Sequence, residues 1–109
     1  MLVLEDEHVG SVAGYVSWAR QGFVGRDYIT FLCVQGASRR RGLGTALLRA
    51  AVAAIGPGRT FISTEEDNHP MLALLQREGW NFAGSVAGAN LNGVVELFFF
   101  KDLDAGGET

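Results

Sequence analysis

The chain has 109 residues, a formal net charge of −3 at pH 7 and 48% hydrophobic residues, which together predict a single globular domain. No apolar run reaches the roughly 18 residues that a membrane helix requires, and a single cysteine excludes a disulfide within the chain. Positive charge is concentrated in one triplet, Arg39–Arg41, rather than spread over a broad basic face. These features argue against nucleic-acid and membrane partners and favour a cytoplasmic protein.

The first third of the chain predicts three strands, at residues 1–5, 11–19 and 27–34, because β-branched and aromatic residues are concentrated there. Turn signals at residues 7–10 and 21–25 separate the three segments. These connections are too short for a crossover between parallel strands. We therefore expect an antiparallel meander.

The apolar period changes to that of a helix over residues 42–55, and Gly56-Pro57-Gly58 ends it. A strand follows at 60–64, then a second helix that starts near Pro70 and ends at Gly79, then strands at 82–86 and 94–101. This order predicts an α/β (α+β) fold, in which a mixed, mostly antiparallel sheet has a central parallel strand pair and two packed helices. Residues 94–100 are apolar on both alternate faces, so we expect them to be covered on both sides. Residues 1–101 form the expected domain, and 102–109 a flexible acidic tail.

A polar, glycine-containing loop joins the strand at 27–34 to the first helix. The amides of a helix's first turn lack intrahelical partners and bind phosphate well. Gly42 and Gly44 leave room for a diphosphate, and Arg39–Arg41 add positive charge. On glycine spacing alone, an ordinary strand-to-helix turn explains the segment equally well. The segment lacks the Lys-Ser or Lys-Thr of a P-loop and the Gly-x-Gly-x-x-Gly of a dinucleotide site.

The run Arg39-Arg40-Arg41-Gly42-Leu43-Gly44 resembles the acetyl-coenzyme A motif of the GNAT superfamily of N-acetyltransferases. The similarity continues at matching spacings through Ile62-Ser63-Thr64, Asn68 and Gly79-Trp80, and covers roughly residues 10–101. It implies the acyl-CoA N-acyltransferase fold without its N-terminal strand and helices. It also implies acetyl-CoA as the acyl donor, and no metal ion.

The resemblance assigns coenzyme contacts to three segments. The strand end would hold the pantetheine arm through backbone groups, and the central parallel strands would separate near Val34 and Ile62 to admit it. The loop and first helical turn would bind the pyrophosphate, and the asparagine before the second helix would contact the arm. The implied residues are Leu32, Cys33, Val34, Arg39, Arg40, Arg41, Gly42, Leu43, Gly44, Thr45 and Asn68.

The chain departs from the family pattern at both usual catalytic positions. Many members have a tyrosine seven residues after the asparagine, where this chain has Leu75, and a glutamate where it has Ser63. Because the coenzyme thiol is acidic, the missing acid should slow the reaction without abolishing it. Cys33 stands where a small apolar residue is usual, which predicts a packing role.

A base for the acceptor amine must therefore come from elsewhere. Glu96 is the first candidate, because it interrupts an apolar strand; an exposed place at the strand mouth is the alternative. Glu65 and Glu66 would attract a cationic amine, although a solvated loop explains them equally well. Tyr28 could bind substrate through its hydroxyl or belong to the core.

These observations support two functions. The first is an N-acetyltransferase that acts on a primary amine of an unidentified acceptor. The second is a catalytically weak or inactive coenzyme A-binding module that works with a partner chain. Few residues precede the first matching strand, so sheet and coenzyme surfaces that the family usually covers would be exposed, which favours a homodimer.

Overall fold

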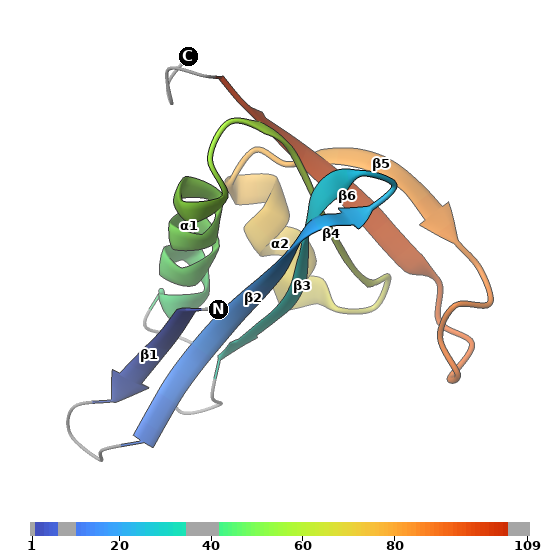
Figure 1. The fold of residues 1–109 in the computed structure, drawn as a ribbon. Helices are drawn as coiled ribbons and strands as arrows, with labels where there is room; N and C mark the ends of the chain where they lie inside the picture. Colours follow the sequence, from blue (N-terminus) through green and yellow to red (C-terminus); the bar gives the residue numbers. More distant parts are fainter. Residues whose placement is uncertain (1, 7–10, 35–41, 105–109) are drawn as a thin grey trace.

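The computed structural model describes residues 2–6, 11–34 and 42–104 (Figure 1). The elements are β1 (Leu2–Asp6), β2 (Ser11–Phe23), β3 (Arg26–Val34), α1 (Leu43–Ile55), β4 (Gly58–Glu65), α2 (His69–Arg77), β5 (Asn81–Val86) and β6 (Glu96–Leu103). Their order and types are those predicted from the sequence. Neither helix in the described residues is long and apolar enough to cross a membrane.

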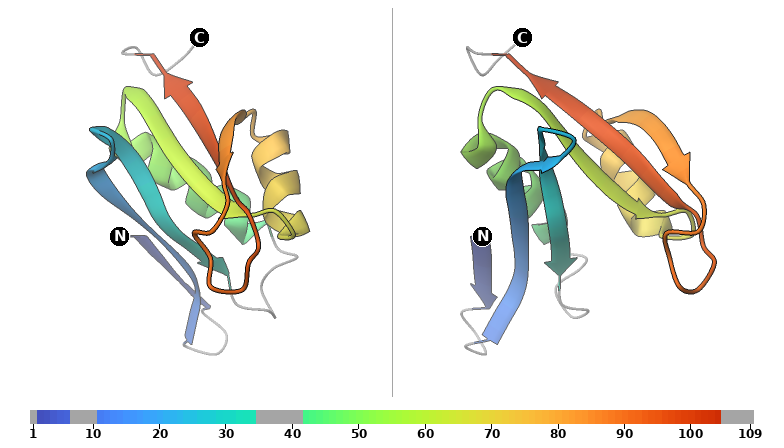
Figure 2. Two further views of the ribbon diagram at one scale, coloured as in Figure 1. Left: turned by 90° about the vertical axis from the view of Figure 1, so that its right-hand side faces the viewer. Right: turned by 45° about the vertical axis from the view of Figure 1, so that its right-hand side comes forward.

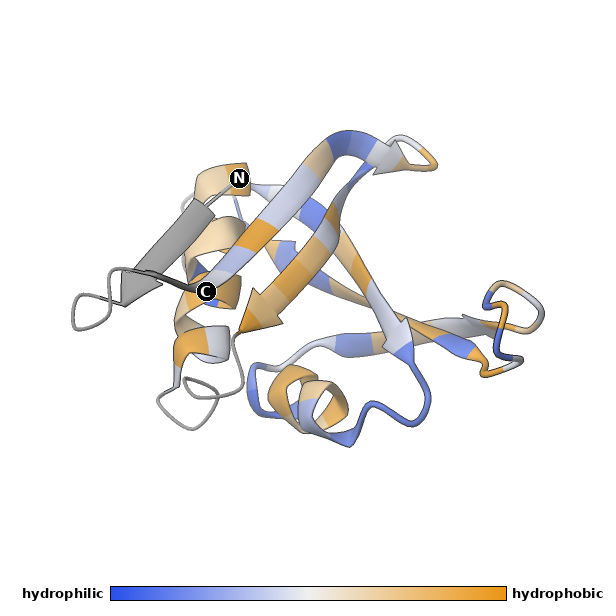
Figure 3. Cartoon of the chain, turned by 90° about the horizontal axis from the view of Figure 1, so that it is seen from below, coloured by the Kyte–Doolittle hydropathy of each residue, from blue (hydrophilic) through white to orange (hydrophobic). Residues whose placement is uncertain are grey.

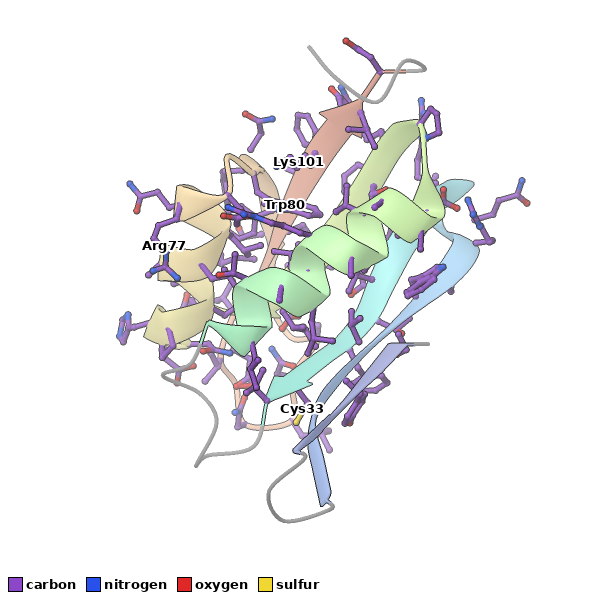
Figure 4. All side chains as sticks on the ribbon, turned by 90° about the vertical axis from the view of Figure 1, so that its left-hand side faces the viewer. Cys33, Arg77, Trp80 and Lys101 are labelled. Atoms are coloured by element: carbon purple, nitrogen blue, oxygen red, sulfur yellow. The ribbon has the colours of Figure 1, made fainter. Side chains whose placement is uncertain are left out.

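The described strands form one mixed sheet with the order β1-β2-β3-β4-β6-β5. Only β3 and β4 pair in parallel, and every other neighbouring pair is antiparallel. Both helices lie on the same side of the sheet, as the opposite views in Figures 2 and 4 agree. The structure thus confirms the antiparallel meander, the central parallel pair and the two packed helices.

A tight hairpin joins β2 to β3, and it lengthens β2 by four residues beyond the predicted end at residue 19. Phe23 pairs with Arg26, so Val24 and Gly25 alone form the turn. Both have positive φ, 49° and 79°, as a type I′ turn requires. This is an unfavourable conformation for a β-branched residue such as Val24, so the turn signal at residues 21–25 did not reveal how tight the turn is.

The core lies between the helices and one face of the sheet. Val16, Ile29 and Ile62 supply the sheet side, and each is at most 2% exposed. The helix side comes from the apolar stripes of α1 and α2 together with Trp80. Figure 3 shows apolar positions running along the central strands and both helices. Burial of these side chains is the main force that holds α1 and α2 on the sheet.

The opposite face of the sheet carries an aromatic cluster, defined here as Phe23, Tyr28, Phe61, Phe98 and Phe100. The Phe23 ring centroid is 5.0 Å from that of Phe61 and 5.2 Å from that of Phe98. These rings are half-buried, and both described helices lie on the other face. The expectation that residues 94–100 are covered on both sides is therefore wrong for the described part of the chain.

Strand β6 extends through Asp102 and Leu103, two residues into the segment expected as a tail. Arg59 of β4 donates to both carboxylate oxygens of Asp102, at 2.7 and 2.9 Å. These hydrogen bonds lower the pKa of the Asp102 carboxyl. Residues 105–109 lie outside the described residues.

Candidate functional site

The two parallel strands at the centre of the sheet separate at their carboxyl ends. Pairing between β3 and β4 runs over three positions, from Asp27–Thr60 to Ile29–Ile62. In the described chain no pairing between them continues beyond that point, although β3 runs to Val34 and β4 to Glu65. Figure 2 shows the two strands diverging. The expected separation is present, and it begins directly after Ile62.

A cleft of about 290 Å³ opens at the end of β3, on the side of the helices. Five of the residues implicated by sequence share its wall: Leu32, Cys33 and Val34 from β3, Gly44 from α1, and Asn68 from the turn before α2. The remaining wall comes from α2 and is apolar: Pro70, Met71 and Leu74. Three segments distant in sequence thus meet at one cavity.

The first turn of α1 presents backbone donors that have no intrahelical acceptor. Gly42 precedes the helix with a φ of 73°, which glycine adopts without strain, and no side chain caps the helix within the described residues. The first intrahelical bond runs from the Ala46 N–H to the Gly42 carbonyl at 3.2 Å. The amides of Leu43, Gly44 and Thr45 therefore lack intrahelical acceptors and lie at the positive end of the helix dipole. Arg39, Arg40 and Arg41 lie outside the described residues.

Asn68 begins α2 and fixes the far wall of the cleft. Its backbone N–H donates to the Glu65 carbonyl at 3.0 Å, and its Oδ1 accepts from the Met71 N–H at 3.3 Å. Pro70 in the first turn has no backbone N–H and therefore needs no acceptor there. The side-chain oxygen is thus occupied by capping, whereas the side-chain NH₂ makes no hydrogen bond within the described residues.

Cys33 and Leu75 lie in opposite environments. Cys33 is exposed, so the packing role predicted for it is wrong: it lies in β3 beyond the last residue that pairs with β4. Leu75, at the position of the family tyrosine, is 0% exposed and belongs to the core. It therefore has no access to the cleft.

Ser63, which stands where many family members have a glutamate, is hydrogen-bonded to Tyr28, a candidate substrate-binding residue. The Tyr28 hydroxyl and Ser63 Oγ are 2.6 Å apart and partly buried. Tyr28 also stacks near Phe23 in the aromatic cluster. The Tyr28 ring thus packs outside the core between the helices and the sheet, and its hydroxyl makes a polar contact beside the opening between β3 and β4. Its role in substrate binding stays a prediction.

Glu65 and Glu96 are brought together at the carboxyl end of β4. They stand directly opposite each other in the β4–β6 pairing, on the same face as the aromatic cluster. Neither joins an ion pair within the described residues, and like charges placed opposite each other repel. Glu66 is exposed on the following turn, and its backbone N–H donates to the Val95 carbonyl at 2.9 Å.

Two asparagines hold these carboxylates and were not identified from the sequence. Asn90 Nδ2 donates to Glu96 Oε1 at 3.0 Å and to the Val94 carbonyl at 2.9 Å. Asn92 Nδ2 donates to Glu65 Oε1 at 3.4 Å. The Asn-Leu-Asn-Gly run has the composition of a turn, but its contacts with β4 and β6 depend on the fold. Glu96 begins β6 and is half-buried, so it lies at the strand mouth and also makes a specific contact.

The fold of the chain is similar to that of several solved acetyltransferases. The fold matches a GNAT-family acetyltransferase from Bacillus cereus with a TM-score of 0.76 and 21% identity, over 92% of this chain and 68% of that one. It matches Arabidopsis thaliana NAA60, in complex with a bisubstrate analogue, with a TM-score of 0.78 and 20% identity, over 92% and 70%. It matches nourseothricin acetyltransferase with a TM-score of 0.79 and 22% identity, over 92% of this chain and 62% of that one.

The profile described as the Acetyltransferase (GNAT) family matches residues 1–80, and the chain belongs to that family. A search of curated proteins finds no match. The chain spans about two thirds of the length of the matched structures. Membership supports acyltransfer in general and leaves the acceptor open.

Proposed function

We propose that the chain is an N-acetyltransferase that binds acetyl-CoA in the cleft at the end of β3 and transfers the acetyl group to a primary amine. The observation that carries the proposal is the shared wall of that cleft. It joins the end of β3, an uncapped first turn of α1 and Asn68, the three segments to which the family resemblance assigns the coenzyme. Such a coincidence is not expected of an ordinary strand-to-helix turn.

The residues present fit the coenzyme chemically. The amides of Leu43, Gly44 and Thr45 would donate to the pyrophosphate, and Arg39–Arg41 would supply charge. A Cβ on Gly44 would lie 3.5 Å from Leu74 Cδ2, so the missing side chain keeps the space beside the helix open. The end of β3 beyond its pairing with β4 would receive the pantetheine arm, with Asn68 beside it.

The helix-free side of the sheet would receive the acceptor. Glu65 and Glu66 would attract a cationic amine toward the opening between β3 and β4, and Tyr28 would line it. Glu96 would take a proton from the ammonium group. The amine nitrogen then bonds to the acetyl carbonyl carbon while the C–S bond breaks, and the nitrogen loses its second proton to water. Water also protonates the leaving thiolate, because Leu75 cannot.

Thiol release from acetyl-CoA across a panel of amines tests this function, with acceptor-dependent release as the expected result. Glu96→Gln should lower turnover about 100-fold and leave coenzyme affinity unchanged. Asp104→Asn, an exposed carboxylate at the other end of β6, is the matched control and should have wild-type turnover. Unchanged turnover in Glu96→Gln would remove the assignment of the base.

A second function is favoured by the burial of Leu75, because no acid can act from that position. In this alternative, the chain is a coenzyme A-binding module with weak or no catalysis, completed by a partner chain. Calorimetry would then detect acetyl-CoA binding, whereas no amine in the panel would release thiol. Binding and release together would exclude the module.

We also propose that the protein is a cytoplasmic homodimer. The cytoplasmic assignment rests on the single cysteine. The dimer is supported by the half-exposed aromatic cluster, since a second copy packed there would remove its apolar surface from water. Light scattering at micromolar concentration should give twice the chain mass of 11.7 kDa. A monomeric mass would contradict the dimer.

A further inference from the structure

A second and larger cavity lies at the other end of α1. Its volume is about 470 Å³, and it is enclosed by the later turns of α1, the end of α2, and β6. Apolar wall comes from Leu48, Val52 and Leu103, and polar groups come from Arg49, Glu78, Trp80 and Lys101. It shares no lining residue with the cleft at the end of β3. The family assignment therefore gives it no role.

Trp80 brings a buried donor without an acceptor to this cavity. The residue is 7% exposed, and within the described residues no acceptor lies within hydrogen-bond distance of its indole Nε1. Buried donors are almost always paired in folded proteins, because an unpaired one retains its full desolvation cost. Less than 1 Å² of this nitrogen is exposed, so a ligand in the cavity cannot accept from it unless the indole moves, and its N–H serves as a reporter of the cavity wall.

The charges around the cavity leave an excess of one positive charge. Both carboxylate oxygens of Glu78 accept from Arg49, from Nε at 2.6 Å and Nη2 at 3.0 Å, and these bonds lower the pKa of the Glu78 carboxyl. Lys101 Nζ donates to the Glu78 backbone carbonyl at 2.5 Å and joins no ion pair in the described part of the chain. An ammonium has three donors, so two remain.

We propose that this cavity is a second binding site, for a small amphipathic carboxylate. The carboxylate would accept from the Lys101 ammonium, and the apolar body of the ligand would pack on Leu48, Val52 and Leu103. Figure 4 shows Trp80 and Lys101 as neighbours beside α1, far from Cys33 at the end of β3. A cationic ligand is disfavoured because Arg49 already neutralises Glu78.

The test uses 3-phenylpropionate as probe and its neutral amide as the matched control. Of the two tryptophans, Trp80 reports on the cavity, while Trp18 in β2 is the internal reference. In a ¹⁵N-labelled protein, the Trp80 indole N–H resonance should shift saturably with the carboxylate, and the Trp18 resonance should stay in place. The amide should bind the wild-type protein at least about fivefold more weakly than the carboxylate does. The carboxylate should bind Lys101→Met with the same loss, because each change removes a charge-assisted hydrogen bond.

Ala53→Phe provides a second variant, because it fills the cavity while keeping Lys101. It should abolish the Trp80 shift and leave acetyl-CoA affinity unchanged, which keeps the result independent of the coenzyme proposal. The inference is overturned if the Trp80 resonance does not respond at tens of millimolar probe. It is equally overturned if the amide binds as well as the carboxylate, or if Ala53→Phe responds as the wild type does.

Discussion

The two ends of helix α1 differ in whether side chains hydrogen-bond to their terminal backbone groups. At the carboxyl end, Arg20 Nη1 donates to the Ile55 carbonyl at 2.8 Å and Nη2 to the Ala54 carbonyl at 3.4 Å, so the terminal acceptors have partners. At the amino end, no side chain caps the helix within the described residues. Helix termini normally find such partners. Among the described residues, a cation thus completes the carboxyl end of α1, whereas no side chain occupies the amino end, where a phosphate is expected.

The largest effect should come from a negative charge at the amino end. Gly44→Glu places a carboxylate in the first turn, which favours the helix dipole but repels a diphosphate. We expect acetyl-CoA affinity to fall about 100-fold or more in calorimetry. Ala50→Glu adds the same charge on the exposed side of the same helix and should bind as the wild type does. Equal affinities in the two variants would contradict the special role of the amino end.

The next effect concerns the packing that positions the wall of the cleft. Gly14 of β2 pairs with Val34, and a Cβ there would lie 2.8 Å from the Cys33 carbonyl oxygen and 3.1 Å from Leu47 Cδ1. Gly14→Ala should therefore lower the free energy of unfolding by about 2 kcal/mol in urea titration. Gly84→Ala is the control, since nothing lies within 4 Å of its Cβ. A neutral Gly14→Ala would show that the close approach is unnecessary.

A smaller effect is expected at the carboxyl end. Arg20→Met keeps the aliphatic stem and removes the two donors to the last turn of α1. Thermal unfolding should show a loss of about 1 kcal/mol, because two terminal carbonyls and a favourable charge–dipole contact lose their partner. Coenzyme affinity should not change. A tenfold loss of affinity would mean that the two ends are not independent.

The smallest effect is a pH dependence that belongs to the second cavity. Arg49 lowers the pKa of Glu78 in the folded state, so the pair stabilises the fold above the ordinary glutamate pKa and stops doing so as the pH falls through the lowered value. Glu78→Gln should lower the Tm by about 2 °C near pH 7, and this difference should vanish once the pH is below the lowered pKa of the Glu78 carboxyl. A difference that persists in acid would show that the effect is packing rather than charge.

Local patterns were sufficient to predict the sequence of elements and the three segments that meet at the cleft. The helical period of residues 43–55 and the Asn68–Pro70 start of α2 depend on neighbouring residues. The β2–β3 turn was predicted within residues 21–25, but its two-residue form was not, because Val24 adopts an unfavourable φ that composition does not reveal. The open aromatic face and exposed Cys33 were missed because coverage depends on where both helices pack.

The remaining features of the site depend on contacts between distant residues. Glu65 meets Glu96 only through the β4–β6 register, and Asn90 reaches Glu96 only through the intervening loop. Trp80 matched a family position in the sequence, but its unpaired indole N–H follows from what surrounds it in the fold. Such pairings need the register and packing of the whole sheet, which single-residue patterns do not determine.

A crystal structure of the protein with acetyl-CoA tests the central claim most directly. The account predicts the pyrophosphate on the amides of Leu43, Gly44 and Thr45, with the pantetheine arm between the ends of β3 and β4 and Asn68 beside it. Acetyl-CoA bound elsewhere, including in the cavity at the carboxyl end of α1, would contradict it. So would the absence of bound coenzyme in crystals grown with millimolar acetyl-CoA.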